Sequence, residues 1–174
     1  MNDRVLVVGM MAAGKTTIGR AVADRLGWPY YDNDELLQRA TGSDTRTFLE
    51  QHGEAALRRA ESTALTVALT EGGPLVAGVA GGVVVDPLDR DRLRTGGFVV
   101  WLRASIETLV RRASGSDRPW LKDDPRAALT ALYAGRADLY LSVASLVVDV
   151  DILPPAAVAD RIVAAVAAVG HSVD

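Results

Sequence analysis

The chain has 174 residues, a formal net charge of −3 and no cysteine. That length suits one domain with a sizeable core, and the lack of cysteine excludes disulfides, thiolate metal sites and a cysteine nucleophile. The acidic balance without a long basic run argues against nucleic-acid binding. Its apolar stretches are too short or too interrupted by charge to span a membrane, so we expect a cytoplasmic protein with no membrane partner.

The first predicted unit is a strand, a loop and a helix. Residues 4–8 form a short apolar run, which is typical of a buried parallel strand. Residues 9–16 read G-x-x-x-x-G-K-T, the phosphate-binding loop (P-loop) pattern. Apolar residues then recur at helical spacing until Gly27, which ends the helix. Because the motif lies between a strand and a helix, we interpret it as a nucleotide site and not as a glycine-rich turn without a ligand.

Each fixed position of this loop has a physical role. Gly9 and Gly14 permit tight turns that point successive N–H groups at phosphate oxygens. Lys15 reaches the β and γ phosphates, and the Thr16 hydroxyl is a ligand for Mg²⁺. The motif therefore predicts a nucleotide that has β and γ phosphates, together with Mg²⁺. The loop residues predicted to bind the nucleotide are Gly9, Ala12, Ala13, Gly14, Lys15, Thr16 and Thr17.

The rest of the chain alternates short strands with helices. Further strands are predicted at 28–32, 75–77, 98–102 and 146–149, and helices at 34–40, 45–51, 54–69, 86–94, 106–112, 125–141 and 155–169. This alternation implies βαβ units, a parallel sheet and a ligand at the C-terminal edge of its strands. The 78–82 loop follows a strand, so we expect it at that edge. The polar stretch 114–124 has no regular pattern, and we expect a mobile lid over about 113–124.

Two aspartates flank Asn33 at the end of the second predicted strand. Residues i and i+2 of an extended chain point the same way, so the carboxylates of Asp32 and Asp34 can both face the phosphate site. One carboxylate can bind Mg²⁺ through water, and the other can hold or deprotonate an attacking hydroxyl. The alternative is that Asp34 only caps the next helix. Beside a P-loop we favour the functional interpretation.

Three arginines are candidates for anion binding. Arg58 and Glu61 share a helix face; they form either a solvated ion pair of little value or an arginine oriented to grip an anion with its two-pronged guanidinium. Arg118, in the expected lid, can close over the triphosphate and stabilise charge during transfer. Arg136, on the following helix, can point back into the site. For Arg118 and Arg136 the alternative is an ordinary surface arginine.

In their order along the chain, these motifs resemble the shikimate kinase family from about Val5 to Val163. The matching pieces are the P-loop, Asp32-x-Asp34, Phe48 leading to Gly53-Glu54, Arg58-x-x-Glu61, a glycine loop before Asp86-Pro87, Arg118-Pro119 and Arg136-x-x-x-Tyr140. The resemblance implies an α/β P-loop NTPase fold with three layers, in which helices flank a five-stranded parallel sheet of order 2-3-1-4-5. It also implies one kinase domain over 1–174, with acceptor binding at about 33–61, and a monomer.

The resemblance further implies ATP-dependent phosphorylation of the shikimate 3-hydroxyl. Asp34 would hold the substrate hydroxyls, while Arg58 and Arg136 would grip the carboxylate. Arg118 would close over the phosphates, and Arg111 would lie near the adenine. The implied catalytic residues are Lys15, Asp34 and Arg118. The implied substrate-binding residues are Asp34, Arg58, Glu61, Gly81, Gly82 and Arg136, with Gly81 contacting substrate through its backbone. The implied metal-binding residues are Thr16 and Asp32.

Four positions depart from the family pattern. Ala12 replaces a P-loop glycine, Ala80 replaces the first of three glycines, Leu57 replaces a phenylalanine, and Trp120 replaces a lid leucine. If position 80 needs a positive φ, alanine there costs on the order of 1 kcal/mol or more. Nucleotide binding should survive these changes, but three of them border the acceptor pocket. Two alternatives therefore stay open: a kinase of the same fold for another hydroxy acid such as gluconate, and a non-catalytic ATP-binding regulatory module.

Overall fold

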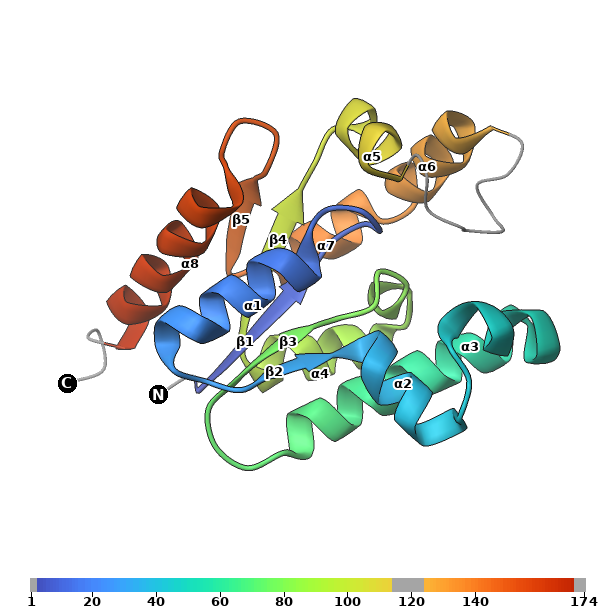
Figure 1. The fold of residues 1–174 in the computed structure, drawn as a ribbon, viewed down its shortest axis with the longest axis horizontal. Coiled ribbons are helices and arrows are strands. Elements are labelled where there is room, and N and C mark those ends of the chain that lie inside the picture. The colour runs from blue at the N-terminus through green and yellow to red at the C-terminus, as the bar shows by residue number, and fades with distance from the viewer. Residues whose placement is uncertain (1–2, 114–123, 171–174) are drawn as a thin grey trace.

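Five parallel strands form the centre of the structure, a computed structural model that describes residues 3–113 and 124–170 (Figure 1). The strands are β1 (Arg4–Val8), β2 (Tyr30–Asp32), β3 (Leu75–Gly78), β4 (Phe98–Arg103) and β5 (Leu146–Asp149). All neighbouring strands are parallel, and their spatial order is β2-β3-β1-β4-β5. This confirms the expected fold class and strand order. Arg118, Trp120 and most of the expected lid lie outside the described residues.

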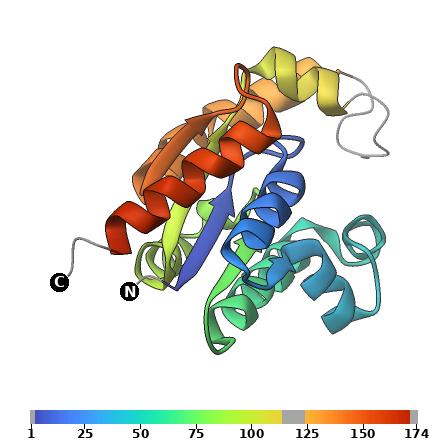
Figure 2. The same ribbon diagram turned by 60° about the vertical axis from the view of Figure 1, so that its left-hand side comes forward.

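Helices cover both faces of this sheet. They are α1 (Lys15–Leu26), α2 (Asn33–Thr41), α3 (Thr45–Thr70), α4 (Pro87–Gly96), α5 (Ile106–Ala113), α6 (Pro125–Ala134), α7 (Ala137–Val143) and α8 (Pro155–Gly170), with a short 3₁₀ helix, η1 (Val83–Val85). Figures 1 and 2 show α1 and α8 side by side on one face, whereas α4 and α7 lie on the other. None of the helices described is both long and apolar enough to cross a membrane.

The middle of the sheet is the core of the protein. Val5, Leu6 and Val7 of β1 are fully buried, and so are Leu75 and Val76 of β3. Strands that are covered on both faces require such continuous apolar runs, because neither side of the strand meets water. The loops that follow β1 and β3 therefore start from a rigid, dry base.

Glycines at both ends of α1 have the left-handed backbone that ends a regular helix. Gly14 precedes the helix with φ 100°, and Gly27 follows it with φ 67°. The Gly27 N–H donates to carbonyls of the last turn. L-residues with a Cβ adopt this conformation only with strain, so glycine suits both positions. The predicted P-loop helix and its end at Gly27 are confirmed.

The single helix predicted over 125–141 is wrong, because the chain forms two helices there. Helix α6 ends at Ala134, and the Gly135 N–H caps it on the Ala131 carbonyl at 3.2 Å. Arg136 has φ −126° and stands as the N-cap of α7. Glycine has a low helix propensity, and the apolar periodicity on either side hid this interruption. Because of this break, Arg136 does not lie on the surface of one continuous helix. It precedes α7 as its N-cap.

The long helix α3 contains a sharp interruption at Gly53. Its φ of 77° and ψ of 172° lie far from helical values, and they separate two helical segments. The sequence predicts such a division, with helices at 45–51 and 54–69. A Cβ at Gly53 would meet no atom within 4 Å, so the backbone angle, and not crowding, favours glycine there.

Candidate functional site

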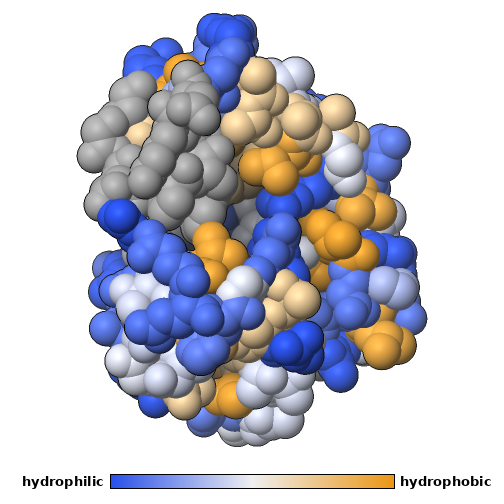
Figure 3. All heavy atoms as spheres, turned by 90° about the vertical axis from the view of Figure 1, so that its right-hand side faces the viewer, coloured by the Kyte–Doolittle hydropathy of each residue, from blue (hydrophilic) through white to orange (hydrophobic). Residues whose placement is uncertain are grey.

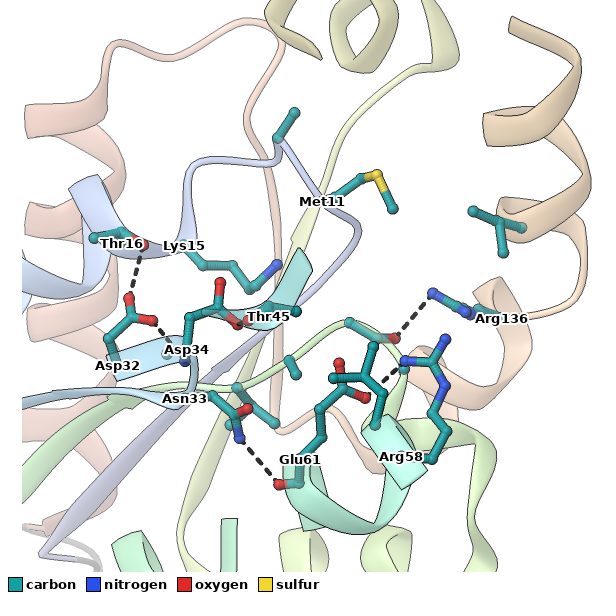
Figure 4. Close-up of a pocket in the computed structure, with 18 of the residues that line it drawn as sticks. Met11, Lys15, Thr16, Asp32, Asn33, Asp34, Thr45, Arg58, Glu61 and Arg136 are labelled. Carbon is teal, nitrogen blue, oxygen red and sulfur yellow. Dashed lines mark hydrogen bonds and ion pairs between the residues drawn. The ribbon is translucent and has the colours of Figure 1, made fainter. Parts of the chain in front are cut away.

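The site is a cavity of about 670 Å³ at the C-terminal edge of the strands. Figure 3 shows the molecule hollowed on this side, and Figure 4 shows the side chains that surround the cavity. It lies between the P-loop, the start of α2, residues 45–61 of α3, the loop after β3 and the start of α7. Its lining includes these predicted site residues: Ala12, Gly14, Lys15, Thr16, Thr17, Asp32, Asp34, Arg58, Glu61, Gly81, Gly82 and Arg136.

The side chain of Lys15 folds back on the P-loop and binds its backbone. Lys15 Nζ donates to the carbonyl oxygens of Gly9 and Met10, both at 3.0 Å. Gly9 has φ 146°, and a Cβ there would lie 2.7 Å from the Leu102 carbonyl oxygen, so only glycine fits. Gly9 does not line the cavity, and neither does the fully buried Ala13. These two residues therefore belong to the side of the loop that faces away from the cavity.

Backbone strain in the P-loop falls on Ala12. Among the residues described, it is the one non-glycine residue with a positive φ, 62°. An L-residue in this left-handed region costs roughly 1–2 kcal/mol. For Ala80 we also considered, from the sequence, the cost of a positive φ. Ala80 is not among the positive-φ residues. The alanine at position 80 is therefore compatible with its backbone, whereas the one at position 12 is strained.

Asp32 joins the P-loop helix to α2. One carboxylate oxygen, Oδ1, caps α2 by accepting from the Asp34 N–H at 3.0 Å. The other, Oδ2, accepts from the Thr16 hydroxyl at 2.9 Å and from the Tyr30 hydroxyl at 3.1 Å. The alternative interpretation was that Asp34 caps this helix. The cap of α2 is instead Asp32. Asp34 lies in the first turn of α2, so the extended i, i+2 geometry expected for the two aspartates is wrong, although both line the cavity.

Oxygen atoms that suit Mg²⁺ meet at Thr16 and Asp32. A hydroxyl and a single carboxylate fit this ion, which keeps several waters and takes further oxygens from phosphates. No group of three or more histidine, cysteine or acidic side chains forms a metal cluster within the described ranges. This donor set matches a metal that arrives with a nucleotide and not one held in a protein cage.

Tyr30, on β2, also contributes to this corner of the site. Its half-buried ring fills a slot where a Cβ on Gly19 would lie 2.5 Å from the ring, and a Cβ on Gly78 would overlap the hydroxyl. Burial, followed by the charge of Asp32, raises the pKa of the Tyr30 hydroxyl well above its usual value. The hydroxyl therefore stays protonated and donates to Asp32.

The Asp34 carboxylate receives a hydrogen bond that the sequence did not reveal. The Thr45 hydroxyl, at the start of α3, donates to Asp34 Oδ1 at 3.2 Å. Both side chains line the cavity, and in Figure 4 Asp34 and Lys15 point into the same space. A carboxylate in this position can accept a hydrogen bond from a substrate hydroxyl close to the phosphate loop. Thr45 lies eleven residues away along the chain, at a separation that no local motif marks.

Arg58 and Glu61 form a partly buried pair, which excludes the solvated surface pair considered from the sequence. Arg58 Nη1 lies 2.6 Å from Glu61 Oε2, and the Glu61 side chain is 7% exposed. A second carboxylate, from Glu54, lies 3.1 Å from Arg58 Nη2. Burial raises the pKa of the Glu61 carboxyl, and the neighbouring Arg58 opposes that rise. The Asn33 amide donates to the Glu61 carbonyl at 3.1 Å and so ties α2 to α3.

Gly82 leaves room for the Arg58 guanidinium. A Cβ at Gly82 would lie 2.5 Å from Arg58 Cζ, so any side chain there would displace that group. Arg136 is 8% exposed, and its Nη1 donates to the Gly81 carbonyl at 3.4 Å. Figure 4 shows the two guanidinium groups on the same side of the cavity. Two arginines directed at one space form a site for a carboxylate or a phosphate.

Arg111 does not reach the cavity, but its neighbour Arg112 does. Arg111 is exposed and donates to the Thr108 hydroxyl at 3.2 Å. Arg112 donates to the carbonyls of Ala13 at 3.1 Å and Val150 at 3.2 Å. It also lines a smaller, adjacent cavity of about 190 Å³, together with Gly14, Thr17, Ile18, Val150, Leu153, Pro155 and Val158. The resemblance implied Arg111 as the arginine near the adenine, but adjacent positions on a helix face about 100° apart.

Comparisons with known proteins agree with this geometry. Residues 11–167 match the protein-family model described as shikimate kinase. The chain is 38% identical over 156 residues to the shikimate kinase of Paramagnetospirillum magneticum, with 88% of this chain and 80% of that protein covered.

Two solved structures are similar to this chain in fold. The shikimate kinase of Acinetobacter baumannii in complex with shikimate has a TM-score of 0.90 and 29% identity, with 95% of this chain and 93% of that one covered. A gluconokinase from Sinorhizobium meliloti has a TM-score of 0.70 and 21% identity, with 97% and 94% covered. The second likeness is one of fold alone.

Replacing Ala12 by glycine should stabilise the protein. Relief of the left-handed strain outweighs the added freedom of the unfolded chain, so the free energy of unfolding should rise by about 0.5–1 kcal/mol. Urea unfolding measures this as a higher midpoint with an unchanged m-value. The matched control is Ala13→Gly, next to it at an ordinary φ, which should lower the midpoint. A lower midpoint for Ala12→Gly would show that position 12 is not strained.

Proposed function

The chain belongs to the shikimate kinase family, and on that premise we propose that it transfers the γ-phosphoryl group of ATP to the 3-hydroxyl of shikimate, giving shikimate 3-phosphate and ADP. The observation that carries this proposal is the shared cavity of about 670 Å³. It holds a phosphate loop, a carboxylate suited to a hydroxyl and two arginines suited to a carboxylate. An acceptor that has both a hydroxyl and a carboxylate satisfies all three.

On the donor side, the P-loop amides and Lys15 would bind the β and γ phosphates. Thr16 and Asp32 would hold Mg²⁺, directly or through water. When bound, Mg²⁺ supplies positive charge that neutralises the phosphate oxygens during transfer. Lys15, held at 3.0 Å from two loop carbonyls, is already in place to add a second positive charge.

On the acceptor side, Arg58 and Arg136 would grip the carboxylate and so set the orientation of the ring. Asp34 would then accept a hydrogen bond from the hydroxyl that attacks, and it can take the proton that this hydroxyl loses as the new P–O bond forms. Thr45 limits the rotation of the Asp34 carboxylate through its hydrogen bond at 3.2 Å. Reaction in line with the leaving ADP depends on this positioning.

The adenine would occupy the smaller cavity beside the start of α1. Its walls include the apolar side chains of Val150, Leu153 and Pro155, and Arg112 borders it. Apolar walls with a bordering guanidinium suit a purine ring. We therefore propose Arg112, in place of Arg111, as the arginine that contacts the base.

The following proposals rest on the sequence and its family resemblance alone. Arg118 would close over the phosphates with the lid at about 113–124. The chain would act as one kinase domain over 1–174, with the acceptor bound by about 33–61. We also expect it to act as a monomer in the cytoplasm.

Release of ADP with Mg-ATP and a set of acids tests the proposed acceptor. We expect release that depends on shikimate, at least about 100-fold above that with gluconate, quinate or no acceptor, because the site must match both hydroxyl and carboxylate positions. Release with gluconate alone would contradict the proposal and favour a kinase for another hydroxy acid. ATP binding without turnover of any acid would favour the non-catalytic module.

Removing either arginine should weaken acceptor binding selectively. Arg58→Ala and Arg136→Ala should each raise KM for shikimate by about 10–100-fold, the range for a lost charge-assisted hydrogen bond. KM for ATP should stay nearly constant. The matched control is Arg92→Ala, because Arg92 also pairs at 2.6 Å with a buried acid three residues away, Asp89, but lies outside the cavity. An unchanged KM for shikimate in both test variants would contradict the proposed carboxylate grip.

A further inference from the structure

Tyr140, on α7, is fully buried and lies outside the cavity lining, yet its hydroxyl contacts the site. The hydroxyl donates to the Gly81 carbonyl at 2.7 Å, a short hydrogen bond. The Tyr140 ring stacks on Trp101 of β4, with ring centroids 5.7 Å apart and an interplanar angle of 25°. The stacking on Trp101 of the sheet holds the Tyr140 ring in place, and the position of the ring in turn determines where the hydroxyl lies.

The contact sets the orientation of a peptide that faces the cavity. No peptide among the described residues is cis, so the Gly81 carbonyl and the Gly82 N–H point in opposite directions from their shared plane. The carbonyl is directed at the buried Tyr140, and both glycines line the cavity. The Gly82 N–H therefore points away from Tyr140. The preceding carbonyl, of Ala80, accepts from the Val83 N–H at 3.2 Å, so that peptide is held as well.

The loop after β3 has little room to take another conformation. A Cβ on Gly81 would lie 3.1 Å from the Gly9 carbonyl oxygen and 3.2 Å from the Tyr140 hydroxyl. Gly81 is thus packed between the P-loop and the tyrosine. The Tyr140 hydroxyl also lies 3.9 Å from the Met10 sulfur of the P-loop. The same hydroxyl therefore contacts both loops of the site.

Arg136 approaches the same carbonyl from the same helix. Its Nη1 lies 3.4 Å from the Gly81 oxygen, compared with 2.7 Å for the tyrosine hydroxyl. The Arg136 carbonyl accepts from the Tyr140 N–H at 2.9 Å, so the two residues are one turn apart. The tyrosine makes the shorter bond, so the Gly81 carbonyl keeps a hydrogen-bond donor when the guanidinium turns to an anion.

We propose that Tyr140 is a positioning residue for acceptor binding, which holds the Gly81 carbonyl so that the Gly82 N–H and the Arg136 guanidinium are both presented to the acceptor carboxylate. The proposal rests on the proposed function and adds a residue that does not itself touch the substrate. Burial raises the pKa of the Tyr140 hydroxyl to about 12, so it remains a donor at neutral pH.

The variant Tyr140→Phe tests this role, because it removes one oxygen atom and keeps the ring that stacks on Trp101. We expect KM for shikimate to rise about tenfold, the effect of losing a hydrogen bond that orients a charged contact. We expect kcat and KM for ATP to stay within about twofold. Steady-state assays at 10 °C, with thermal unfolding measured in parallel, keep a moderately destabilised variant folded.

Ile162→Val provides the control for a loss of stability alone. Ile162 is a fully buried residue of α8, outside the cavity, so its truncation should lower the melting temperature and leave both KM values unchanged. Three results would overturn the proposal: an unchanged KM for shikimate in Tyr140→Phe, an equal effect on kcat and on both substrates, or the same rise in Ile162→Val. A wild-type protein that does not phosphorylate shikimate would instead refute the proposed function.

Discussion

The parallel sheet is the constraint on which the site depends. Every strand of a parallel sheet ends at the same edge, so segments distant in sequence meet there. With β1 at the centre of the order β2-β3-β1-β4-β5, the P-loop lies between the segments that follow β3 and β4. Asp32, at the end of β2, and the loop after β3 reach the same edge and line the same cavity. The sheet core is dry and apolar, which keeps these segments in fixed relative positions.

Within the cavity, charged groups are held by partners before any ligand arrives. Arg58 is paired with Glu61 and Glu54, and Glu61 is tied to α2 through Asn33. An ion pair of this kind adds little to stability when desolvation is counted. Its value lies in orientation, because a guanidinium already held in place loses less freedom on binding an anion. The Tyr140 hydroxyl likewise orients the neighbouring backbone, through its hydrogen bond to the Gly81 carbonyl.

The sequence predicted the elements whose signals are local, and it failed where tertiary context decides. The P-loop, the alternation of strands and helices and the end of α1 follow from motif, periodicity and glycine. The break before Arg136 did not, because apolar spacing continues across it. Our proposal of Arg112 in place of Arg111 depends on the rotation of the helix, which places Arg112 at the smaller cavity. The strain at Ala12 and the bond from Thr45 to Asp34 depend on backbone angles and on packing between helices, which the sequence does not state.

The central claim is that an ionised carboxylate, gripped by Arg58 and Arg136, places a hydroxyl beside Asp34 and the P-loop. The most direct test compares kcat/KM for shikimate with that for its methyl ester, which keeps the ring and hydroxyls but has no negative charge. We predict a value at least about 100-fold lower for the ester, since two charge-assisted contacts are lost. A value within about threefold of that for shikimate would contradict the claim, because the arginines would then contribute little to acceptor binding.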